Sequence, residues 1–248
     1  MPDEPRLEEQ ALSSAAEMTL SSQLDEAENI DVDIRSDLLK VVQGEVDSVS
    51  IEGKGLVMQK DIRVQEMQLQ TDSIAVNPLS VLFGQIELNQ PVDATVRLVL
   101  TEPDINRAFN SDYMRSKMQN MELNVEGKTA ILEPLQMELQ LPGSGRMVFR
   151  ANALLHDEIG KTKQIGFIAT MLVKTGEQPL LMEGFNCTPP GQGISVELAI
   201  AFMKKLRELL NLPYYEFEGM SLRVKDMDVE KGSLTLHTEA HVTQIPSS

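Results

Sequence analysis

The chain has 248 residues, a net charge of −16 and a single cysteine. So acidic a surface repels phosphate backbones, which argues against nucleic acid as a partner. Cys187 has no second cysteine to pair with, so a disulfide framework is excluded and a reducing compartment is favoured.

Residues 1–22 are rich in Glu, Ser and Ala. Leu7, Ala11, Ala15 and Met18 follow helical spacing, but the apolar face is weak, so we predict an acidic arm that is partly disordered or helical. This start lacks the basic residues and unbroken apolar stretch of a signal peptide. No apolar run approaches the ~18 residues of a membrane span. We therefore expect a cytoplasmic protein, with peripheral contact to an internal membrane as an option.

From residue 30 onward the apolar period changes from 3.6 to 2, which predicts β-strands. Ile30, Val32 and Ile34 alternate with polar residues. Further alternating or apolar segments predict strands near residues 49–51, 62–69, 92–100, 121–125, 135–141, 147–155, 165–173, 180–185, 215–224 and 233–242.

Two helices are predicted between these strands. Thr101 can cap a helix that begins at Glu102, with Asp104 returning the capping contact, and this helix should run to about Met118. A second helix is predicted over 195–210. Many antiparallel strands, two or three helices and no βαβ rhythm predict an α+β fold, with a long curved sheet around the helices. No composition break divides residues 23–245, so we expect a single domain there.

Three motifs resemble chemical sites but fail on their context. Residues 160–162 read Gly-Lys-Thr, yet Leu155 stands where a phosphate-binding loop needs glycine, and the segment lies between strands. His237 and His241 lie on a predicted strand, ~13 Å apart, too far to share a metal ion. Cys187 has no adjacent base and suits an inert thiol. We predict no catalytic residue, no metal site, no cofactor and no enzymatic activity.

Three features favour a pocket for an apolar ligand. The strand 165–173 is apolar on both faces, and the helix 195–210 has an unusually wide apolar stripe. Methionine is abundant, at 14 residues, while tryptophan is absent, and flexible thioethers adapt to irregular contents. Each feature alone also fits the ordinary core of a large sheet protein.

Several segments resemble the LmeA-like phospholipid-binding family. They are residues 43–51, 53–57, 62–76, 91–96 and 220–236, and above all 100–106, which read Leu-Thr-Glu-Pro-Asp-Ile-Asn at the end of a strand. The resemblance covers about residues 21–242, and cyanobacterial and plastid-type members match the spacing best. It implies a fold similar to the tubular lipid-binding superfamily and a capacity for phospholipids, but defines no active site. Characterised relatives are exported or anchored by an N-terminal segment, which residues 1–22 do not resemble. We therefore expect this chain to act on the cytosolic face of an internal membrane.

Two functions remain open at this point. In the first, the protein binds or transfers phospholipid, or a similar apolar lipid, in a groove between sheet and helices, where each buried CH₂ contributes ~0.8 kcal/mol. In the second, it is a scaffold or assembly factor with the groove filled, whose acidic surface meets a basic protein partner. The residues that we predict to bind lipid are Phe83, Phe109, Met114, Met118, Phe202, Met203 and Leu206.

Overall fold

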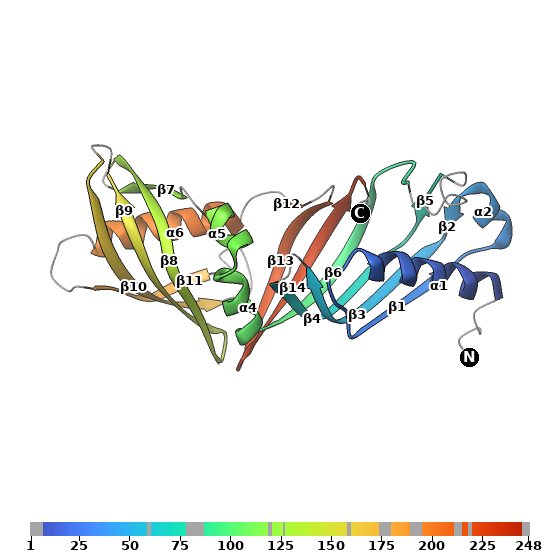
Figure 1. The fold of residues 1–248 in the computed structure, drawn as a ribbon, viewed down its shortest axis with the longest axis horizontal. Coiled ribbons are helices and arrows are strands. Elements are labelled where there is room, and N and C mark those ends of the chain that lie inside the picture. The colour runs from blue at the N-terminus through green and yellow to red at the C-terminus, as the bar shows by residue number, and fades with distance from the viewer. Residues whose placement is uncertain are drawn as a thin grey trace. The chain divides into compact units, whose positions relative to one another are not determined.

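The computed structural model describes residues 7–58, 61–77, 87–118, 121–125, 127–157, 160–173, 180–188, 195–210, 215–217 and 220–244 (Figure 1). Its mostly antiparallel strands and its helices confirm the predicted α+β class. The chain divides into two compact units. The first unit is Met1–Val99, Pro213–Lys225 and Leu236–Ser248, and the second is Leu100–Leu212 and Asp226–Thr235.

Most of a seven-stranded sheet lies in the first unit; its strands follow the order β1-β3-β4-β6-β14-β13-β12, and their residues 100–101, 226–230 and 233–235 belong to the second unit. The strands are β1 (Asn29–Arg35), β3 (Ser48–Met58), β4 (Ile62–Thr71), β6 (Val92–Thr101), β12 (Tyr215–Phe217), β13 (Met220–Glu230) and β14 (Ser233–Val242). A small second sheet pairs β2 (Glu45–Val46) with β5 (Ile74–Ala75). The strand pattern at residues 30–34 and 92–100 thus predicted β1 and β6 correctly.

Helix α1 (Leu7–Ser22) closes the free edge of β1. Among the described strands β1 pairs only with β3, so its alternate N–H groups point away from the sheet. Side chains spaced by four along α1 accept hydrogen bonds from amides spaced by two along β1 and the residue that follows it, at a common donor–acceptor distance of 3.1 Å. The pairs are Val32 N to Glu17 Oε1, Ile34 N to Ser13 Oγ, and Ser36 N to Glu9 Oε1. The spacings match because four helical residues rise about 6 Å and two strand residues about 6.6 Å.

Apolar packing supports this polar ladder. Leu12, Ala16 and Leu20 of α1 pack against a cluster built on Val32, Ile34 and Val49. Residues 7–22, for which a partly disordered or a helical arm was expected, are thus a helix that lies on the sheet edge.

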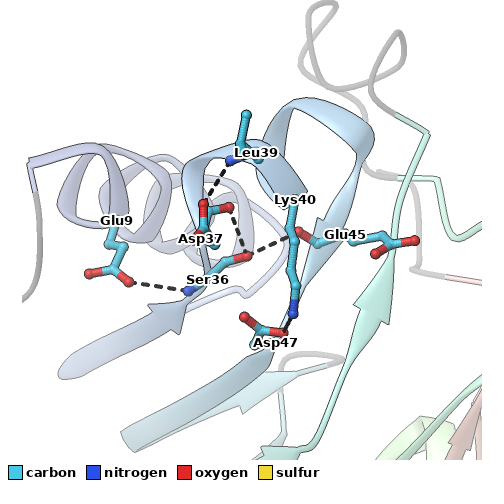
Figure 2. A network of polar contacts seen from close by, with 7 residues as sticks. All are labelled: Glu9, Ser36, Asp37, Leu39, Lys40, Glu45 and Asp47. Carbon is cyan, nitrogen blue, oxygen red and sulfur yellow. Dashed lines mark hydrogen bonds and ion pairs between the residues drawn. The ribbon is translucent and has the colours of Figure 1, made fainter.

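The short helix α2 (Leu38–Gln43) is capped at both ends, and Figure 2 shows the polar contacts around its start. Asp37 caps its start by accepting a hydrogen bond from Leu39 N at 3.0 Å. Gly44 ends it with φ 81°, in the left-handed region that glycine adopts without strain. Lys40 pairs with Asp47, and the hydrogen bond between them raises the pKa of the lysine.

The second unit is built on a five-stranded antiparallel sheet in the order β11-β10-β9-β8-β7. Its strands are β7 (Met121–Val125), β8 (Lys128–Gly143), β9 (Arg146–His156), β10 (Thr162–Val173) and β11 (Leu180–Thr188). The sheet curls into a half-barrel, and α6 (Ser195–Leu210) lies across its concave side and contacts both edge strands, β7 and β11 (Figure 1). Irregular pairing at Pro134, at Gln140–Gly143 and at Thr170 bends the long strands.

Helices α4 (Glu102–Phe109) and α5 (Asp112–Met118) replace the single predicted helix. Thr101 caps α4 as expected, accepting a hydrogen bond from Asp104 N at 3.3 Å. Asn110 caps the end of α4, and its side-chain amide donates a hydrogen bond to Met137 O of β8. The Ser111 hydroxyl accepts a hydrogen bond from Met114 N at the start of α5.

A second ladder joins α4 to the part of β8 that extends beyond β7. Side chains spaced by four again meet backbone groups spaced by two. Glu102 Oε2 accepts from Leu141 N at 2.6 Å; Asn106 accepts from Leu139 N at 2.7 Å and donates to Leu139 O at 2.8 Å; Asn110 accepts from Met137 N at 3.3 Å and donates to Met137 O at 2.9 Å. The helix therefore replaces a missing neighbour strand.

This ladder makes a testable prediction. Asn106→Ala removes two hydrogen bonds and leaves the N–H and C=O of Leu139 without protein partners, so we expect the free energy of unfolding to fall by about 2 kcal/mol. Urea denaturation measures this change. Asn106→Asp keeps the acceptor for Leu139 N, so its free energy of unfolding should lie between those of the wild type and Asn106→Ala. Unchanged stability of Asn106→Ala would show that the ladder contributes little.

Candidate functional site

The concave side of the half-barrel carries one apolar core to which the sheet and α6 both contribute. Leu198 of α6 is only 1% exposed. It belongs to one buried cluster with side chains from β7, β8, β9, β10 and α6, namely Leu123, Leu132, Met137, Ala151, Ala153, Ile165, Phe167 and Ala201.

Phenylalanines gather on this core. Five of the seven in the chain contact one another. Phe202 of α6 stacks on Phe149 with ring centroids 5.9 Å apart and meets Phe167 edge-on at 5.3 Å. Phe167 stacks on Phe185 at 5.4 Å, and Phe109 meets Phe149 edge-on at 6.0 Å. Such pairs contribute ~0.5–1.5 kcal/mol each beyond the burial of their area.

Around the core lies a set of partly buried apolar side chains, which we name the apolar rim. Its members are Phe109, Met118, Met121, Val125, Phe149, Leu155, Phe185, Cys187 and Phe202. They retain exposed apolar surface beside a closed core, and the two methionines among them adapt easily to a neighbour's shape. The rim therefore offers an apolar ligand a surface that needs no polar partner.

The structure brings three of the predicted lipid-binding residues together, because Phe109, Met118 and Phe202 all belong to the apolar rim. Met114 on α5 and Met203 on α6 are half-buried and are not rim members. Met203 follows Phe202 directly, which places it about 100° further around the helix.

The two other predicted residues cannot be placed. Leu206 belongs to α6, but its side chain lies outside the described part of the structure, as does Phe83 altogether. The role of all seven in lipid binding stays a prediction.

Sequence reasoning missed the strand phenylalanines of the site. Phe149, Phe167 and Phe185 occupy inward positions of β9, β10 and β11. The alternation that predicted these strands also marked Phe149 and Phe167 as members of one face. The alternation could not predict the curl of the sheet, which brings these side chains to α6.

One cross-strand group has the connectivity of a catalytic triad. His156 Nδ1 lies 2.9 Å from Thr162 Oγ1, and His156 Nε2 lies 3.1 Å from Glu133 Oε2. However, the His156 side chain is 30% exposed and that of Glu133 46%. Water therefore screens the charge that a buried triad would stabilise, and the register pairs Thr162 directly with His156. We interpret the group as a polar ladder across neighbouring strands.

The other sequence motifs have structural roles. Residues 160–162 join β9 to β10, where Gly160 N donates a hydrogen bond to Asp157 O at 3.0 Å. His237 and His241 lie on strand β14, as the alternation predicted, and His241 Nδ1 is 2.7 Å from Asp93 Oδ1.

Cys187 belongs to the apolar rim, and the reactivity of its thiol reports on burial there. Burial raises the pKa of its thiol, and the nearby charge of Lys163 offsets this only in part. At neutral pH the thiol is therefore protonated and weakly nucleophilic.

From this we predict slow alkylation. At pH 8 iodoacetamide should modify Cys187 in the folded protein several-fold more slowly than in urea-unfolded protein, and the folded rate should keep rising at pH values where an ordinary thiol has levelled off. Mass spectrometry of timed samples measures both rates. A folded protein that reacts as fast as the unfolded chain would contradict the burial of this thiol.

The comparisons with known proteins add the following. A family model described as LmeA-like phospholipid-binding matches residues 4–239, nearly the whole chain. No curated protein and no solved structure matches significantly. Within the described residues, none of the helices combines the length and the hydropathy that crossing a bilayer requires.

Proposed function

The chain belongs to the LmeA-like phospholipid-binding family, and on this premise we propose that its half-barrel binds phospholipid without catalysing a reaction. The acyl chains lie against the apolar rim, where each CH₂ removed from water contributes about 0.8 kcal/mol. The observation that carries the proposal is the rim itself: nine partly buried apolar side chains surround a single core.

The proposal includes a cytosolic site of action. A chain with one cysteine forms no internal disulfide, which fits a reducing compartment. The acidic net charge of −16 weakens attraction to anionic lipid surfaces. Contact with a membrane therefore depends on apolar groups or on local charge.

A scaffold function remains the second candidate, because one observation favours it. Leu198 and Ala201 of α6 are buried in the core of the concave side, and Phe202 packs against that core. If they leave no room for an acyl chain, the half-barrel is a solid platform for protein partners. The two functions differ in whether purified protein retains lipid.

For the lipid function we predict that the protein binds a fluorescent phospholipid, and that Phe202→Ala weakens this binding about tenfold. The substitution removes the ring that contacts Phe149, Phe167 and Phe185. Ile200→Ala is the matched control, since it truncates an apolar side chain of the same helix that is exposed and outside the rim, and it should bind like wild type. Fluorescence titration measures affinity, and circular dichroism confirms folding.

A second measurement keeps this test decisive if Phe202→Ala fails to fold. Bound phospholipid should slow the alkylation of wild-type Cys187, because that side chain is a rim member. A wild-type protein that binds no phospholipid, and whose Cys187 reacts equally with and without it, would favour the scaffold.

Helix α2 supplies the apolar contact that membrane docking requires, as a further part of the proposal. Leu39 and Val42 are 72% and 71% exposed, three positions apart on one helix face. The caps at Asp37 and Gly44 fix this helix, so its apolar face is presented to water at a cost that a bilayer would remove.

We therefore predict that Leu39→Ser combined with Val42→Ser lowers the fraction of protein that floats with phosphatidylcholine vesicles several-fold. The exposed Ile200 of α6 serves as the control, and Ile200→Ser should leave flotation unchanged. Equal flotation of the double variant and the wild type would remove α2 from the proposed membrane contact.

A further inference from the structure

Helix α1 covers the outer edge of β1 with contacts that a further strand could make in its place. Its side chains Glu9, Ser13 and Glu17 accept hydrogen bonds from three outward amides. The backbone carbonyls of an added strand would accept from the same amides, and its N–H groups would reach the outward carbonyls of β1. The ladder is therefore a set of acceptors that an extended chain can replace.

The apolar support of α1 is also replaceable. Leu12, Ala16 and Leu20 pack against the cluster of the first unit and remain partly exposed themselves. Met18, another large apolar side chain of this helix, is 74% exposed. An added strand would cover the same cluster with apolar side chains of its own.

The charge of α1 does not complement the strand that it covers. Residues 7–22 contain three glutamates and neither lysine nor arginine. Strand β1 carries Asp31 and Asp33 against a single arginine, Arg35, which pairs with Asp33 at 2.9 Å. An acidic helix thus lies on an acidic edge strand, and Coulomb's law gives this arrangement no attraction.

Asp31 is also part of a like-charge pair. In the antiparallel register of β1 and β3 it lies directly opposite Glu52, and both residues are exposed. Like charges directly opposite each other destabilise a sheet. Within the described part of the chain, no ion pair joins either carboxylate to a cation. A positive charge next to Asp31 would therefore stabilise this edge.

The two faces of β1 define the side chains that an added strand needs. Asp31 and Asp33 lie on the polar face, whereas Val32 and Ile34 belong to the apolar cluster. Residues of an added strand share the face of the residues that they lie opposite. Basic and apolar side chains in alternation would therefore match both faces of the edge.

We propose that α1 is a removable cover of a strand-addition site on β1, and that this site admits an extended segment of a partner protein in which basic and apolar residues alternate. The basic side chains lie beside Asp31 and Asp33, and the apolar ones take the place of Leu12, Ala16 and Leu20. A second copy of the chain fits less well, because it brings the same net charge of −16 to the edge. This site is independent of lipid binding by the half-barrel.

Two fluorescent peptides test the required pattern. One alternates valine and lysine, and the other has the same composition with the valines and the lysines in separate blocks. Fluorescence anisotropy with the full chain at physiological ionic strength should show about tenfold tighter binding of the alternating peptide, since only this peptide matches both faces. Equal affinity for the two peptides would indicate non-specific attraction to an acidic surface and would overturn the proposal.

Loosening the cover should strengthen binding of the alternating peptide. Ser13→Ala with Glu17→Ala removes two acceptors of the ladder, so the fraction of protein with an open edge rises and the apparent affinity should increase several-fold. Ser14→Ala is the matched control, because it truncates the exposed neighbour on the same helix and should bind like wild type. Equal affinity of the double variant and the wild type would show that the peptide binds elsewhere.

Reversal of one charge keeps the test decisive if the double variant fails to fold. Asp31→Lys should weaken the valine–lysine peptide about tenfold and strengthen an alternating valine–glutamate peptide, since it reverses the charge next to the added strand. Asp228→Lys makes the same change of net charge at an exposed position of β13 and should alter neither affinity. Equal effects of the two substitutions would assign binding to overall charge and overturn the site.

Displacement of α1 has a readout of its own. Glu9 and Glu17 are held against β1 and the residue that follows it. A glutamate-specific protease should therefore cut after Glu17 several-fold faster when the alternating peptide is bound, because an undocked helix opens more readily. Mass spectrometry of timed samples measures the rate. Unchanged cleavage in the presence of bound peptide would contradict the removal of α1.

Discussion

The unpaired backbone groups at a strand edge are the constraint that organises both units. Each edge offers alternate N–H and C=O groups that another strand could seize. In the first unit α1 covers β1, and in the second α4 covers the free part of β8, each with side chains at positions i, i+4 and i+8. In both units a helix thus satisfies the unpaired backbone groups of a strand edge with the same spacing of side chains, although the residues differ.

This constraint also explains the segment 100–106, in which the sequence resemblance is most distinctive. Thr101 caps α4, Glu102 bonds Leu141, and Asn106 grips both backbone groups of Leu139. Alternation and capping rules predicted the strands and the start of α4 because both are local properties. They could not predict either ladder, since the identity of the exposed edge depends on strands distant in sequence. For the same reason α1 looked weak: its polar residues Ser13 and Glu17, which weaken an amphipathic pattern, are its contacts.

The candidate site was predictable in part for a related reason. The wide apolar stripe of residues 195–210 marked α6 as a helix with more than one apolar neighbour, and Phe202 does meet phenylalanines of three strands. The curl that assembles those strands arises from irregular pairing along β8 and β10, which no periodicity records.

Because of the α1 ladder, exchange of neighbouring amide protons along β1 with deuterium depends on different opening motions. The protons of Val32, Ile34 and Ser36 are held by side chains of a helix, whereas those of the residues between them point toward β3. An undocking of α1 that leaves the sheet intact releases only the first set to exchange. Exchange of the first set thus reports on the opening of the helix, and exchange of the second set reports on the opening of the sheet. The ratio of the two exchange rates measures how independently the N-terminal helix opens.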